Sequence, residues 1–199
     1  MYGLPKEITL DGKAYKIREN GDYRMIIDVI AALQDYEISE QERMLSALII
    51  FYEDLNTVED VFTIFDSPEQ AAREMMSFIA TDDEQSGCQT KMKLVDWVQD
   101  EKLIVSAVNN VARTEIRELP HLHWWTFISY FMAIGECPLQ TIVGIRSKIA
   151  RHKKLQDYEQ EFKRNNPQYF IWKSDIQKGQ NTLQQLLGDG WGNDTKEGL

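Results

Sequence analysis

Residues 121–134 (HLHWWTFISYFMAI) form an apolar segment with five aromatic side chains, and this segment limits the possible folds most strongly. It is too short to cross a bilayer, which takes roughly 20 apolar residues. It is also too apolar on all sides for an ordinary surface helix. We therefore expect a helix enclosed by its neighbours in an all-helical core, with a ligand-binding segment as the open alternative. Its Trp124, Trp125, Phe127 and Phe131 are expected to be largely buried.

The rest of the chain predicts a mainly α fold, with about seven helices in a single domain. Ser39 and Glu42 form a capping-box pattern, which predicts that a helix begins there. A short helix is expected over 57–65, with Val58, Val61, Phe62 and Phe65 facing inward. A long helix is expected over 93–114, where Trp97 begins the apolar stripe and is counted among the core residues.

Three regions are expected along the chain. Residues 1–20 predict a small N-terminal β-hairpin, because an Asp11-Gly12 turn joins two alternating runs and sets Ile8 opposite Tyr15. Residues 21–165 form the helical domain, interrupted by an exposed loop at 81–90. Residues 166–199 predict a mostly irregular or disordered, flexible tail.

The charge and the cysteines exclude several classes of protein. The net charge of −10 lies in the first 100 residues, which carry 21 acidic and 9 basic side chains. Phosphate backbones would be repelled there, so nucleic acid is not an expected partner, and only a local patch could serve. No membrane partner is expected either, since the apolar segment is too short to span a bilayer. Two distant cysteines, Cys88 and Cys137, exclude a disulfide framework and a zinc ribbon. The first residues do not resemble a signal peptide, so we expect a protein that is located in a reducing cytoplasm.

No pattern of residues argues for catalysis. His121 and His123 would point about 200° apart on a helix, so they would not share a metal ion. The acidic pairs Asp82/Asp83 and Asp96/Asp100 fit helix starts better than a metal site. Nucleophile elbows, phosphate loops and dinucleotide fingerprints are absent from the sequence. We expect a non-enzymatic protein without cofactor or metal.

A basic cluster is the candidate partner-binding site. Arg146 falls within the apolar stripe of a helix over 138–151, where an unpaired charge would be costly. Either it pairs with a carboxylate such as Asp96, Asp100 or Glu136, or this face meets another chain. Five basic side chains lie between residues 146 and 154. They form either a solvated helix end or a docking site, and the docked partner would be an acidic protein or the acidic half of another copy. They are Arg146, Lys148, Arg151, Lys153 and Lys154.

Three segments together resemble a known family. They are Asp96-Trp97 with Asp100-Glu-Lys-Leu-Ile104, then Leu122-His-Trp-Trp-Thr-Phe127, then Ile142-Val-Gly-Ile-Arg146 with Lys153-Lys-Leu155. The pattern is similar to a family of small phage proteins named after the fifteenth gene product of its founding phage. The resemblance is strongest over 94–165, and residues 112–119 depart from it.

The resemblance implies a tail assembly chaperone of phages and prophages of Gram-positive bacteria. Such a protein would coat the tape measure protein and help recruit tail-tube (major tail) subunits, with self-association as a further option. It would act in the host cytoplasm and be absent from the finished virion. The alternative is a structural tail or connector morphogenesis protein retained in the virion.

Overall fold

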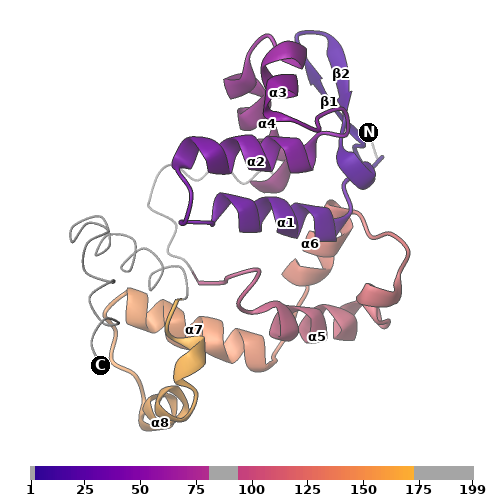
Figure 1. Cartoon of the computed structure of the whole chain (residues 1–199). Coiled ribbons are helices and arrows are strands. Elements are labelled where there is room, and N and C mark those ends of the chain that lie inside the picture. The colour runs from indigo at the N-terminus through magenta and orange to yellow at the C-terminus, as the bar shows by residue number, and fades with distance from the viewer. Residues whose placement is uncertain (1–2, 81–93, 173–199) are drawn as a thin grey trace, which may run out of the picture.

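The protein is mainly α-helical, as predicted, with a small N-terminal hairpin (Figure 1). The computed structural model describes residues 3–80 and 94–172, so the predicted loop at 81–90 and most of the predicted tail lie outside the described residues. The described part contains one two-stranded sheet and eight α-helices: β1 Glu7–Leu10, β2 Lys13–Lys16, α1 Tyr23–Leu33, α2 Glu40–Phe51, α3 Val58–Ile64, α4 Pro68–Ala80, α5 Glu101–Ala112, α6 Trp124–Met132, α7 Pro138–Ala150 and α8 Asp157–Asn165.

The hairpin has the predicted register, with Ile8 opposite Tyr15 in an antiparallel pair. Asp11 and Gly12 form the turn, both with positive φ, as this tight two-residue connection requires. Tyr15 anchors the hairpin on the helices, because its hydroxyl donates to the Ile64 carbonyl and its ring packs 4.9 Å from that of Phe65. Figure 1 shows the hairpin with α3 and α4 at one end of the molecule.

Polar caps fix where the first helices begin. Asp22 accepts from the Arg24 amide at the start of α1, and its second oxygen accepts from the Leu122 amide at 2.8 Å. This carboxylate therefore joins α1 to the segment before α6. Ser39 and Glu42 form the predicted capping box of α2, and Thr57 forms an equivalent box with Asp60 at α3.

The aromatic segment forms α6, which contacts both α1 and α5 near the centre of the molecule (Figure 1). Trp124 and Phe127 are 1% and 0% exposed, as predicted. Phe131 is only half-buried and packs 4.8 Å from the half-buried Trp97. Among the described residues, no helix is long and apolar enough to cross a membrane.

The expected burial of Trp125 is wrong, because this side chain is 38% exposed. Consecutive helix residues point about 100° apart, so Trp125 turns away when Trp124 fills the core. Its indole N–H donates to the Phe78 carbonyl at 3.1 Å, and its ring stacks on that of Phe78. The residue therefore bridges α6 to α4 at the edge of the core.

Two further expectations are corrected. The long helix over 93–114 is shorter, since α5 begins only at Glu101 and the residues described before it form turns. The inward face predicted for the short helix over 57–65, which is α3, is also wrong in part. Val61 and Phe65 are buried, but Val58 and Phe62 are 43% and 59% exposed on the outer side of α3.

Candidate functional site

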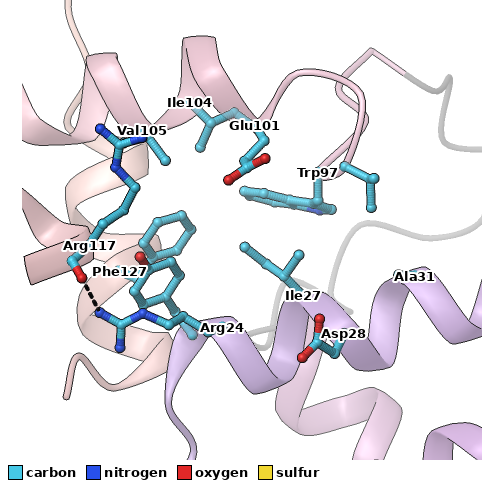
Figure 2. A pocket seen from close by; sticks show the side chains of 12 residues that line it. Arg24, Ile27, Asp28, Ala31, Trp97, Glu101, Ile104, Val105, Arg117 and Phe127 are labelled. Atoms are coloured by element: carbon cyan, nitrogen blue, oxygen red, sulfur yellow. Dashed lines mark hydrogen bonds between the residues drawn. The ribbon is translucent and has the colours of Figure 1, made fainter. Parts of the chain in front are cut away.

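A groove of about 340 Å³ lies between α1 and α5, beside the turn that precedes α5 (Figure 2). Its walls are mainly apolar. α1 contributes Ile27 and Ala31, α5 contributes Ile104 and Val105, and the turn contributes Val98. Val98 is 51% exposed, so an apolar surface is open to solvent at this edge. The groove can therefore accept an apolar side chain or a helix face.

Stacked aromatic rings support the groove from behind. Tyr23 stacks on Phe127 with ring centres 4.6 Å apart and planes only 5° from parallel. Trp97 packs edge-on against Trp124 at 5.4 Å, which fixes the ring that borders the groove. Burial raises the pKa of the Tyr23 hydroxyl above its usual value. These contacts pack the aromatic walls of the groove against one another.

Two carboxylates lie on opposite walls of the groove. Glu101 points into it from α5, and Asp28 lies on the facing surface of α1 (Figure 2). Both side chains are exposed, and neither has an ion-pair partner among the residues that the structure describes. A basic side chain on an otherwise apolar ligand would be attracted here.

Two arginines line the other end of the groove, and both are engaged within the chain. Arg24 pairs with Asp22 at 3.1 Å and donates to the carbonyl oxygens of Ile116 and Leu119. Arg117 pairs with Glu115 at 2.8 Å. Its hydrogen bond to Glu115 lowers the pKa of that carboxyl to about 2. The arginines therefore close this end of the groove, and the pKa of Arg117 is raised first by Glu115 and also by the charge of Glu101.

Arg146 lies in a buried ion pair, one of the two arrangements considered for it. Its guanidinium is 4% exposed and binds both oxygens of Asp100, at 2.5 and 2.9 Å. It also donates to the carbonyl oxygens of Leu94 and Tyr169, and it stacks on Trp172 at 4.2 Å. One side chain thus joins the turn before α5, helix α7 and the segment after α8.

The other candidate basic residues divide into two groups. Lys148 pairs with the buried Glu159 of α8, whose hydrogen bond raises the pKa of the lysine. Arg151, Lys153 and Lys154 are exposed in the connection between α7 and α8. Since Arg146 is enclosed, only these last three residues of the predicted cluster form an open basic surface.

The histidines of the aromatic segment serve different local roles. His121 contacts the Glu19 carbonyl through Nε2. The Nε2 atom of His123 contacts the Pro5 carbonyl at 2.9 Å, and its Nδ1 accepts from the Trp125 amide at 3.1 Å. This second contact makes His123 the N-cap of α6. Over residues 3–80 and 94–172, no three His, Cys, Asp or Glu side chains gather as metal ligands.

Sequence reasoning missed the groove itself. Tyr23 and Ile27 lie on one face of α1, and part of that face borders the groove. The spacing of Tyr23, Ile27 and Ala31 along α1 was the available signal. The facing wall lies more than 70 residues later in the chain, so only the fold brings the walls together.

Comparisons with known proteins point to one family. Its sequence model, described as Bacteriophage Gp15 protein, matches residues 3–170, which is most of the chain. No curated protein and no solved structure matches. The match includes both walls of the groove and the basic connection after α7. The chain therefore belongs to the Bacteriophage Gp15 protein family.

Proposed function

We propose that this phage morphogenesis protein is a non-enzymatic tail assembly chaperone. It would bind helical segments of the tape measure protein in the host cytoplasm and help to recruit tail-tube subunits. The groove between α1 and α5 is the observation that carries this proposal. It offers a mainly apolar lining, open to solvent at Val98, in front of stacked aromatic rings, and such a lining suits helix-in-groove recognition.

The chemistry of the groove suits such a client. A tape measure protein is a long helical chain whose apolar stripes would associate with one another before assembly. If one apolar stripe of the tape measure protein packed against Ile27, Val98 and Val105, that stripe would be removed from water. Asp28 and Glu101 would attract a lysine or arginine beside that stripe. The net charge of −10 would keep the complex soluble.

Release is also part of a chaperone's task. The groove is an open surface feature, and the client would make contact along one face only. Weaker contacts mainly raise the dissociation rate of a complex, so modest contacts would let the tail-tube subunits replace the chaperone. Tight enclosure of the client would oppose assembly.

Co-expression with the tape measure protein encoded by the same phage tests the proposal. We expect that protein to be soluble with the wild-type chain and to pellet with Val98→Asp, which places a charge on the groove wall. The matched control is Met132→Asp, because Met132 is an exposed apolar residue of α6 that does not line the groove. The proposal fails if the tape measure protein is no more soluble with the wild-type chain than without it.

Mass spectrometry of purified virions separates a chaperone from a structural tail or connector protein. A chaperone leaves the assembled tail, so the chain should be absent or present only in traces. Stoichiometric amounts in the virion would favour the structural alternative.

A further inference from the structure

The outer side of α3 carries apolar side chains that are exposed to solvent. Val58 and Phe62 are one helical turn apart, and they are 43% and 59% exposed. Glu59 and Asp66 are exposed close to them in the chain. The surrounding region is strongly acidic, since residues 40–80 contain nine acidic and two basic side chains. We refer to Val58, Glu59 and Phe62, together with Asp66 just after the end of the helix, as the α3 face.

A hollow of complementary character lies beside α8. It measures about 580 Å³ and is lined by Leu155, Gln160, Lys163, Arg164 and Pro167. Its apolar lining comes from Leu155 and Pro167, and its charge is positive. Arg146 and Lys148 are paired within the chain, but among the exposed charged side chains of residues 151–170 five are basic and two are acidic. We refer to the five lining residues as the α8 hollow.

The two features lie at opposite ends of the molecule. Figure 1 shows α3 beside the hairpin at one end and α8 at the other. One copy therefore cannot fill its own hollow. A second copy carries the matching surface, with an exposed aromatic ring among acidic residues facing an apolar depression among basic ones.

We propose that the α3 face of one copy docks in the α8 hollow of the next, with Phe62 inserted against Leu155 and Pro167. Glu59 and Asp66 would then face Lys163 and Arg164, so that opposite charges meet around an apolar centre. The inference does not depend on the proposed chaperone function.

This contact is heterologous, because the two copies contribute different surfaces. A heterologous contact leaves one free surface at each end of a pair, so further copies can add. The assembly is a ring if the rotation that relates successive copies brings the last copy back to the first, and an open chain if it does not. Exposed charge pairs are screened by salt, so the association should weaken as ionic strength rises.

A charge-swap experiment on the full chain tests the proposal. One variant, Glu59→Lys with Asp66→Lys, makes the α3 face basic. The other, Lys163→Glu with Arg164→Glu, makes the α8 hollow acidic. Analytical ultracentrifugation should show concentration-dependent association of the wild type and none for either variant alone. Mixing the two variants should restore association, because each reversed surface then meets one of opposite charge.

Matched controls change the same number of charges elsewhere. Glu7→Lys with Glu136→Lys and Lys6→Glu with Lys102→Glu alter exposed residues outside both surfaces. They should associate as the wild type does. Phe62→Ser keeps every charge and removes an exposed ring, so it should fold normally and lower the association constant by about tenfold or more. Circular dichroism confirms folding of each variant.

The proposal is overturned if the wild type stays monomeric at every concentration. It is equally overturned if the reversed variants associate as the wild type does, or if their mixture stays monomeric.

Discussion

Arg146 shows how a single charge is accommodated within an apolar stripe. The stripe predicted its burial and its need for a carboxylate, but left three candidates. The structure shows that Asp100 is the partner. One carboxylate oxygen of Asp96 is occupied by the Val98 and Gln99 amides, and Glu136 is exposed in a loop. Asp100 also accepts from the Asp96 amide, so backbone hydrogen bonds alone do not single out this partner. Helical spacing does not reveal which carboxylate the fold brings to the guanidinium.

Removing Asp100 should be strongly destabilising. Asp100→Ala leaves the buried Arg146 guanidinium without its charge partner, which typically costs about 3–5 kcal/mol of unfolding free energy. The double variant Asp100→Leu/Arg146→Met should lose less, because no charge remains buried. Urea denaturation measures both. Glu53→Ala is the control, since it breaks an exposed pair with Lys16 and should cost less than about 1 kcal/mol. A small loss for Asp100→Ala would show that the buried pair is not needed.

His123 should make stability depend on pH. Burial lowers the pKa of its imidazole, and its Nδ1 must be unprotonated to accept from the Trp125 amide. The unfolded chain has a histidine pKa of about 6.5. Above that pH both states are neutral. Below it the unfolded chain binds a proton that the folded chain does not, so stability falls as pH decreases, by at most about 1.4 kcal/mol per pH unit.

The variant His123→Asn isolates this effect. Asparagine can still cap α6 but does not titrate. Between about pH 6.5 and 5.5, the wild type should lose more unfolding free energy than the variant, as measured by denaturation at each pH. Equal losses in both proteins would assign the pH dependence to titratable groups other than His123.

At the level of elements, the caps were the most reliable sequence signals. The Ser39/Glu42 box and the Asp11-Gly12 turn were predicted where they occur, because each depends on residues close in sequence. The start of α5 was misplaced for the opposite reason. Asp96 and Asp100 accept hydrogen bonds from backbone amides in the preceding turn, and this local bonding competes with the helix. Apolar periodicity continues through the turn and does not reveal the break.

Removing the α2 cap should have a measurable effect on stability. Ser39→Ala deletes the oxygen that accepts from the Glu42 amide, so it should lower the unfolding free energy by about 1 kcal/mol. Ser106→Ala is the matched control, because Ser106 is exposed within α5, where alanine is the better helix former. Thermal or urea denaturation compares the two. A Ser39→Ala protein as stable as the wild type would show that the cap contributes nothing measurable.

At the scale of the whole molecule, the sequence indicated the fold class but not the groove between α1 and α5. Helices and hairpin follow from local patterns, whereas the groove needs α1 and α5 to meet across a large separation in sequence. The exposed face of α3 was missed because a seven-residue helix has too few apolar positions to define its inward side. Val61 and Phe65 hold α3 in place, which leaves Val58 and Phe62 in solvent.

The central claim is that the groove between α1 and α5 holds a helical segment of the tape measure protein. Hydrogen–deuterium exchange of this chain, alone and in complex with that protein, tests the claim most directly. We predict that added protection will concentrate in residues 23–31 and 97–105, which form the two walls. Protection confined to α7 and α8, with none at the groove, would contradict the claim.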